Sequence, residues 1–239
     1  MKGIILAGGS GTRLRPLTTI TSKQLLPIYN KPMILYPLQT LLTAGIREVL
    51  IIVAPNNAGD FLKLLGSGKE YGCKFTYEIQ DKPGGLAEAF IIGESFLRHD
   101  DVSLILGDNI YEDDFSEAIQ SFQGGGRVFA KQVPDPERFG VVEFDEQRRA
   151  VSIVEKPAEP KSDYAVTGLY IYDKTVVEKT KNLAPSERGE LEITDLNNVY
   201  LKEGSLDVAF VKGHWFDTGT FESMYEAITF VRGRELANQ

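Results

Sequence analysis

The sequence predicts an α/β fold, a three-layer sandwich in which helices cover both faces of a mostly parallel central sheet with antiparallel additions. Two observations lead to this prediction. In the first half of the chain, apolar runs of strand length alternate with glycine-rich or polar connections and amphipathic stretches of helical length. In the second half, strand-like segments follow one another so closely that we expect some of them to pair antiparallel. No low-complexity linker interrupts residues 1–239, so we expect one continuous domain.

The first half is expected to supply the parallel strands and the helices between them. The runs with the length and composition of strands are residues 2–7, 49–54, 75–79 and 103–106, and the stretches expected to be helical are 32–44, 60–65 and 86–97. Pro32 suits the first turn of a helix, and Gly45 stands where a left-handed cap would end it. Because the carboxyl ends of parallel strands form one edge of a sheet, we expect the active site there.

The second half is expected to add further strands and three helices. The strand-like segments are 128–133, 140–144, 150–154, 165–172 and 207–211, and the helices are expected at 173–182, 192–202 and 220–234. Asp173 is a suitable capping residue for the first of these helices. The glycine run 124–126 is expected to be a turn between a helix and a strand.

Composition excludes several classes of protein and of site. The 34 acidic residues outnumber the 26 basic ones, and the net charge of -8 argues against broad adhesion to nucleic acid or to anionic lipid. Cys73 is the only cysteine, so neither an intramolecular disulfide nor a thiolate zinc cluster is possible, as expected of a reducing cytosol. The apolar runs are too short for a signal peptide or a membrane span, so a cytoplasmic protein is expected.

A glycine-rich segment directly after the first strand is the strongest local indication of function. Gly8, Gly9 and Gly11 leave room for backbone N–H groups to approach an anion, and Arg13 adds a fixed positive charge. The alternative is a flexible strand-to-helix turn that binds nothing. The segment lacks the Gly-Lys-Ser/Thr of a P-loop, and Leu14 stands where the dinucleotide-binding fingerprint needs a small residue.

Lys23, ten residues beyond Arg13, is a second candidate cation. A lysine by itself is more often a solvated surface group. Together with the Arg13 loop, however, Lys23 would neutralise a polyphosphate from another side, so triphosphate binding is a reasonable hypothesis.

Two aspartates are candidate metal ligands. Asp108 follows the strand that ends at Leu106, and Asp217 lies far along the chain among aromatic residues and a glycine turn. Mg²⁺ in enzymes is commonly held by one or two carboxylates together with substrate phosphates, so this pair would suffice. The alternative for Asp108 is a cap or turn residue, and the sequence by itself does not establish that the two carboxylates meet.

Two further segments carry groups suited to substrate recognition. Glu155 and Lys156 offer a hydrogen-bond acceptor for sugar hydroxyls and a cation for a monophosphate, although a surface ion pair is an equal alternative. Gln80 carries an amide that would match the edge of a nucleotide base. No nucleophile motif accompanies the two histidines, so covalent catalysis is not indicated.

Taken in order along essentially the whole chain, these motifs closely resemble the signature of the sugar-1-phosphate nucleotidylyltransferases. The matching segments are Gly8–Thr18, Lys23–Pro27, Lys31–Met33, Gln80–Ala87, Gly107–Asn109, Arg138–Val142, Glu155–Pro157, Tyr164–Tyr170, Arg188–Asp195 and Trp215–Gly219. Within this family the chain is most similar to the members that use dTTP and glucose 1-phosphate.

The resemblance implies a Rossmann-like domain that forms dTDP-glucose and pyrophosphate with the help of Mg²⁺. It implies two metal ligands, Asp108 and Asp217, and two catalytic cations, Arg13 and Lys23. The nucleotide-binding residues implied by the matching motifs are Gly8, Gly11, Thr12, Arg13, Gln24, Gln80, Gly85 and Asp108. The implied sugar-phosphate residues are Asn109, Gly140, Glu155, Lys156, Gly168 and Arg188.

The reaction expected is a direct in-line attack by the sugar phosphate on the α-phosphorus of the nucleotide, which needs positioning and charge neutralisation more than a protein nucleophile. A uridylyltransferase remains an alternative, because thymine and uracil differ by one methyl group. A non-catalytic nucleotide-sugar sensor is the other. The resemblance also implies a homo-oligomer, and a short form without the C-terminal helical extension that longer members use for feedback inhibition.

Overall fold

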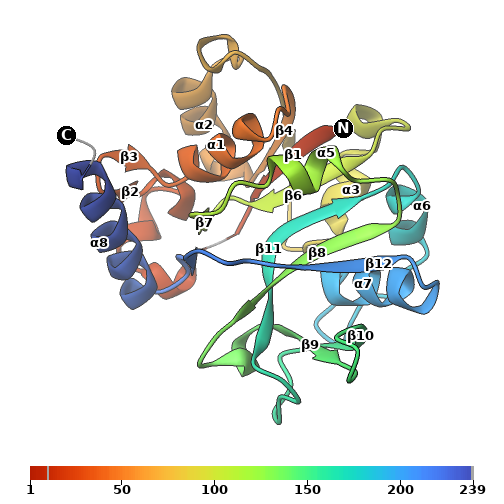
Figure 1. The fold of residues 1–239 in the computed structure, drawn as a ribbon. Helices are drawn as coiled ribbons and strands as arrows, with labels where there is room; N and C mark the ends of the chain where they lie inside the picture. Colours follow the sequence, from red (N-terminus) through yellow and green to blue (C-terminus); the bar gives the residue numbers. More distant parts are fainter. Residues whose placement is uncertain (10, 238–239) are drawn as a thin grey trace.

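The computed structural model describes residues 1–9 and 11–237, and its central feature is a nine-stranded sheet (Figure 1). Four parallel strands form one half of this sheet in the order β6-β1-β4-β5. Their bounds are Lys2–Ala7 (β1), Glu48–Val53 (β4), Lys74–Ile79 (β5) and Val102–Leu106 (β6). These are the strands that the alternating pattern of the first half predicts.

The remaining strands extend the sheet from β6, mostly by antiparallel pairing. They are Gly126–Gln132 (β8), Gly140–Phe144 (β9), Ala150–Glu155 (β10), Tyr164–Tyr172 (β11) and Leu206–Phe210 (β12). Strand β11 pairs antiparallel with β6, β8 and β9, whereas β12 pairs parallel with β8. The register between β11 and β8 shifts between Val166 and Tyr170, which leaves Gly168 outside the ladder.

Helices cover both faces of the sheet, as Figure 1 shows. Their bounds are Leu35–Thr43 (α1), Ala58–Leu65 (α2), Glu88–Ile92 (α3), Glu94–Leu97 (α4), Ser116–Gln120 (α5), Val176–Lys181 (α6), Ile193–Lys202 (α7) and Phe221–Ala237 (α8). Alternate residues of the central strands point to opposite faces, so Ile5 packs in one core cluster with α1 and α2, whereas Ile4 packs in the other with α3 and α7. The predicted three-layer α/β class is therefore confirmed.

A third, smaller core lies beside the sheet and includes α8. Two short hairpin strands, Pro27–Ile28 (β2) and Lys31–Pro32 (β3), pair with each other, and Asn109–Tyr111 (β7) pairs with Trp215–Asp217 (β13). Ile28, Ile110, Ala227 and Val231 pack together between these elements. This packing fixes the segment after β6 against the segment before α8.

Several predicted boundaries differ from the structure. The helix expected from Pro32 begins at Leu35, because Pro32 belongs to the β2–β3 hairpin and Met33 donates its N–H to the Leu26 carbonyl at 2.9 Å. The helix expected over 86–97 is interrupted at Gly93, a poor helix former. The sequence reading missed α5 and the four short strands, which have too few residues to show a periodic pattern.

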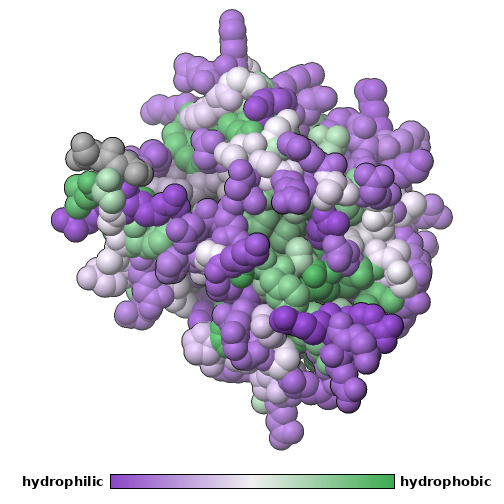
Figure 2. All heavy atoms as spheres, viewed as in Figure 1, coloured by the Kyte–Doolittle hydropathy of each residue, from purple (hydrophilic) through white to green (hydrophobic). Residues whose placement is uncertain are grey.

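The view in Figure 2 shows charged and polar residues over most of one face of the molecule, with hydrophobic residues gathered mainly where β8, β11 and β12 cross the view. In the part of the chain that the structure describes, no helix combines the length and the apolar composition needed to cross a bilayer.

Replacement of Phe90 by alanine tests the core between α3 and the sheet. Phe90 is fully buried, and its ring meets that of Tyr172 edge to face at 5.3 Å. We expect Phe90→Ala to lower the free energy of unfolding by about 3–5 kcal/mol in urea titrations, because a cavity remains where the ring was. Leu62→Ala, at a residue that is 49% exposed, is the control and should cost less than about 1 kcal/mol. Equal losses in the two variants would contradict this description of the core.

Candidate active site

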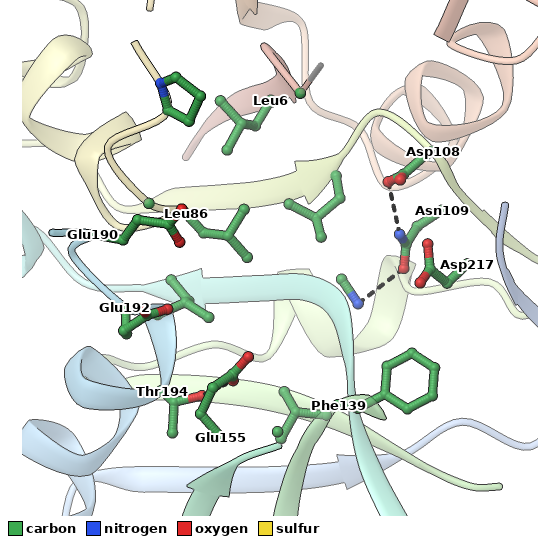
Figure 3. Close-up of a pocket in the computed structure, with 18 of the residues that line it drawn as sticks. Leu6, Leu86, Asp108, Asn109, Phe139, Glu155, Glu190, Glu192, Thr194 and Asp217 are labelled. Atoms are coloured by element: carbon green, nitrogen blue, oxygen red, sulfur yellow. Dashed lines mark hydrogen bonds between the residues drawn. The ribbon is translucent and has the colours of Figure 1, made fainter. Parts of the chain in front are cut away.

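A cavity of about 430 Å³ opens at the carboxyl ends of the parallel strands, where the fold class places a ligand site. Figure 3 shows side chains from β1, β7, β10 and β13 and from the segment before α7 converging on it. The sequence-predicted residues that line it are Gly8, Arg13, Lys23, Gln24, Gln80, Gly85, Asp108, Asn109, Gly140, Glu155, Lys156, Gly168, Arg188 and Asp217.

Two predicted residues of the glycine-rich segment do not line the cavity. Gly11 has a φ of 59°, and its carbonyl accepts a hydrogen bond from Thr18 Oγ1 at 2.7 Å. Thr12 is exposed at the start of a short 3₁₀ helix. Ser10, which belongs to the same motif, lies outside the described residues. Contact between phosphate and Gly11 or Thr12 therefore stays a prediction.

The structure brings Asp108 and Asp217 together. Asp217 ends β13, which pairs antiparallel with β7 so that Asp217 stands opposite Asn109, the neighbour of Asp108 (Figure 3). Thr218 reinforces the junction, because its N–H and its hydroxyl both donate to the Asp108 carbonyl, at 3.1 and 2.7 Å. The sequence by itself does not establish that these two carboxylates lie close together. The pairing of β13 with β7 brings them together.

Burial and mutual repulsion act on this carboxylate pair. Burial, and then the charge of Asp108, raise the pKa of the Asp217 carboxyl to about 6. Burial by itself also raises the pKa of Asp108, but the Lys23 ammonium outweighs it and holds that pKa below its ordinary value. The pair therefore carries more negative charge than Lys23 neutralises, and a second cation would be favourable there.

The two predicted catalytic cations flank the carboxylate pair. Lys23 is almost fully buried, and its Nζ forms an ion pair with Asp108 Oδ2. The Arg13 guanidinium lies against Gly219, where a Cβ atom would stand only 2.7 Å from Arg13 Nη2. The absence of a side chain at Gly219 therefore gives Arg13 room beside Asp217.

Asn109 supports the orientation of Asp108. Its Oδ1 accepts hydrogen bonds from the Gly168 N–H at 3.0 Å, from Trp215 Nε1 at 2.7 Å and from the Tyr111 hydroxyl at 3.4 Å. With Oδ1 engaged in this way, the amide Nδ2 points to Asp108 Oδ1 at 3.1 Å. The predicted contact between Asn109 and the sugar phosphate stays a prediction, since the side chain is only 1% exposed.

Carboxylates and cations alternate at the other end of the cavity. Glu155 accepts a hydrogen bond from Thr194 Oγ1 at 2.7 Å and forms an ion pair with Lys156 at 3.0 Å. The Arg188 guanidinium forms ion pairs with Glu192 at 2.8 Å and Glu190 at 3.4 Å. Such a surface is suited to binding several hydroxyl groups and one monophosphate.

Sequence reasoning missed several residues that line the cavity: Arg138, Phe139, Glu190, Glu192, Thr194 and Trp215. All of them lie inside segments that carry the family resemblance, which was the available indication. Phe139 and Trp215 have ring centroids 5.2 Å apart, so they form an aromatic part of the cavity lining.

The comparisons with known proteins agree with one another. The family model described as nucleotidyl transferase matches residues 2–234. Glucose-1-phosphate thymidylyltransferase of Neisseria meningitidis serogroup A is 58% identical over 238 residues, 97% of this chain and 83% of that protein. The protein of the same name from Mycolicibacterium smegmatis is 51% identical over 241 residues, 99% of this chain and 84% of its own.

Solved structures share the fold over nearly the full length. A Bacillus anthracis protein assigned as glucose-1-phosphate thymidylyltransferase, in complex with sucrose, has a TM-score of 0.93 at 47% identity and covers 97% of this chain and 95% of its own. UDP-glucose pyrophosphorylase bound to UDP-glucose has a TM-score of 0.86 at 26% identity, with 98% of each chain covered.

Asp217→Asn tests the raised pKa of the Asp217 carboxyl. Between pH 4 and 6 the folded protein retains a proton on Asp217 that the unfolded chain has released, so stability falls as the pH rises through this window. Above it, the ionised carboxylate costs about 3 kcal/mol, at about 1.4 kcal/mol per pKa unit. In EDTA, we therefore expect Asp217→Asn to be more stable than the wild type at pH 8 but not at pH 4.

Urea unfolding at the two pH values measures this difference. Asp60→Asn, at an exposed position on α2, serves as the control and should show no such gain. A gain for Asp217→Asn of the same size at pH 4 and pH 8 would contradict a raised pKa for Asp217.

Proposed function

Because the chain belongs to the nucleotidyl transferase family, we propose that it transfers a thymidylyl group from dTTP to glucose 1-phosphate, releasing dTDP-glucose and pyrophosphate. The observation that carries this function is the arrangement of one cavity. Two carboxylates and two cations meet at one end, and hydroxyl-binding and phosphate-binding groups gather at the other. The curated relatives at 50–58% identity carry the name of this activity.

The reaction is a direct displacement at the α-phosphorus of dTTP. A phosphate oxygen of glucose 1-phosphate forms the new bond to this phosphorus, and the bond to the pyrophosphate oxygen breaks. Such a displacement requires alignment of two anions and neutralisation of their charge, and no protein nucleophile. Arg13 and Lys23 stabilise the charge that develops on the leaving pyrophosphate, because both lie at the carboxylate end of the cavity.

Asp108 and Asp217 would hold a divalent metal ion, which nucleotidyl transferases generally use. The donor set fits Mg²⁺, because the two groups are hard oxygen ligands and no histidine or cysteine is among the cavity-lining residues. The Asp217 pKa of about 6, raised by burial and then by the charge of Asp108, also fits, since a cation would favour the ionised carboxylate. When bound, Mg²⁺ supplies positive charge to phosphate oxygens and orients them.

The opposite end of the cavity holds glucose 1-phosphate. Glu155, fixed by Thr194, accepts hydrogen bonds from sugar hydroxyls, and Lys156 and Arg188 bind the phosphate. Gly140 and Gly168 line the same cavity, where they would lie beside the hexose. Gln24 and Gly8 lie on the nucleotide side, while Gln80 and Gly85 face the base.

Two alternatives assign the same cavity differently. A uridylyltransferase would bind the same groups, but the solved UDP-glucose pyrophosphorylases are far less similar to this chain than the thymidylyltransferases are. A nucleotide-sugar sensor would need the cavity without turnover, and the presence of both carboxylates and both cations favours an enzyme.

A single domain is supported by one sheet that includes strands from Lys2 to Phe210. The homo-oligomer and the cytoplasmic location stay predictions.

Pyrophosphate release is the experiment that tests this function. Mixing the protein with dTTP, glucose 1-phosphate and Mg²⁺ should release pyrophosphate continuously, and omission of glucose 1-phosphate should stop it. Steady-state rates with UTP in place of dTTP are expected to be lower by a factor of about 10–200, the range that one methyl group provides. No pyrophosphate from the complete mixture would exclude catalysis and favour the sensor.

Replacement of either metal-binding carboxylate tests the assignment of the metal. Asp108→Asn and Asp217→Asn keep the size of the side chain and remove its charge. We expect each to lower kcat by about a hundredfold or more at ordinary Mg²⁺ concentrations. Asp207→Asn is the control, because Asp207 forms an exposed ion pair with Arg127 away from the cavity lining. Wild-type rates from both active-site variants would refute the assignment.

A further inference from the structure

We propose that Glu88 is a positioning residue that fixes which end of the Gln80 amide faces the nucleotide base, and that it thereby selects bases with a ring N–H group. This inference rests on the proposed function, because it concerns the base end of the same cavity. Glu88 does not itself line the cavity and acts through Gln80.

The contacts of Gln80 determine the orientation of its amide. Gln80 Nε2 lies 2.7 Å from Glu88 Oε2 and 3.4 Å from the Gly85 carbonyl oxygen. A carboxylate and a carbonyl accept hydrogen bonds and donate none, so the end of the amide that faces them must be the NH₂ group. Gln80 is only 7% exposed, which restricts any other orientation of its side chain.

With Nε2 committed to Glu88, Gln80 presents its Oε1 to the cavity. Oε1 lies beside Gly8, 2.5 Å from the position that a Cβ atom would occupy there, and Gly8 itself lines the cavity. Within residues 1–9 and 11–237, no group donates a hydrogen bond to this oxygen. It is also not one of the fully buried side-chain atoms that lack a hydrogen-bond partner. The base end of the cavity therefore offers an acceptor.

The chain provides a defined place for Glu88. A Cβ atom on Gly84 would overlap the Glu88 carboxylate, so glycine at this position admits the acidic group. Glu88 begins α3, and the preceding backbone is tied to Leu191 by hydrogen bonds from Leu191 N to Gly84 O at 2.8 Å and from Ala87 N to Leu191 O at 3.2 Å. The carboxylate is thus positioned by backbone contacts on both sides.

An acceptor at this place distinguishes pyrimidines by their hydrogen-bonding edge. Thymine and uracil carry a donor at N3 between two carbonyl oxygens, whereas N3 of cytosine is an acceptor. Cytosine would place two acceptors against each other in a buried site, and such an unpaired arrangement is strongly disfavoured. The N–H of Gly85, which donates to no other described residue, remains for a base carbonyl.

The test is the ratio of kcat/KM for dTTP to that for dCTP, with glucose 1-phosphate as the second substrate. Glu88→Ala removes the partner of Nε2 and should lower this ratio about 10- to 100-fold. Glu88→Lys offers only donors, so the amide should turn and present Nε2, and the ratio should fall furthest. Glu88→Gln retains a side-chain oxygen that accepts the same hydrogen bond and should restore the ratio to within about threefold of the wild type.

Gly84→Ala is a second, independent variant. It keeps Glu88 but fills the space that its carboxylate occupies, and it needs no unusual backbone conformation, so the ratio should fall as in Glu88→Ala while the fold is kept. Glu94→Ala is the matched control and should leave the ratio unchanged. Glu94 lies on α4, and its exposed carboxylate pairs only with Lys181 among the described residues. In all variants the KM for glucose 1-phosphate should stay constant, which a general loss of structure would not produce.

Unchanged ratios in Glu88→Ala, Glu88→Lys and Gly84→Ala, each folded by circular dichroism, would overturn the inference. The same ratio measured from dissociation constants of dTTP and dCTP by calorimetry does not depend on turnover. A wild type that releases no pyrophosphate but prefers dTTP in a Glu88-dependent manner would refute the proposed enzyme and leave this inference standing. A wild type that binds both nucleotides equally would refute the inference alone.

Discussion

The pairing of β13 with β7 is the contact on which the site depends, because it holds two acidic side chains together in a buried place. Two carboxylates that repel each other would otherwise separate or take up a proton, and burial together with the charge of Asp108 raises the pKa of Asp217. The short antiparallel pair and the two hydrogen bonds from Thr218 to the Asp108 carbonyl prevent the separation. Behind them, the packing of α8 on Ile110 fixes the same junction.

Three of the cations that line the cavity are paired with carboxylates. Lys23 pairs with Asp108, Lys156 with Glu155, and Arg188 with Glu192. A protein with a net charge of -8 that binds two phosphorylated substrates must concentrate its positive charge locally, and these pairs keep each cation in place. Substrate phosphates then compete with carboxylates that are already present, so recognition is an exchange of partners more than the filling of a strongly positive site.

Polar side chains of the site are oriented by hydrogen bonds with neighbouring residues. Trp215, Tyr111 and the Gly168 N–H orient Asn109, which orients Asp108. Glu88 orients Gln80 in the same way at the other side of the cavity. Each chain of contacts joins segments that are distant in sequence, so the geometry of the groups facing the cavity is determined by the packing of several elements.

Local sequence determined the nine strands of the central sheet, most helices and the glycine-rich loop, because these depend on periodicity and on residues close together in the chain. It also identified most of the residues that line the cavity, since they lie in ordered motifs with a strong family resemblance. It did not determine that Asp217 lies beside Asp108, that Trp215 donates to Asn109 across 106 residues, or that Lys23 is paired with a carboxylate. Those contacts join distant segments and arise only when short strands without a periodic pattern pair at the edge of the sheet, so only the tertiary structure decided them.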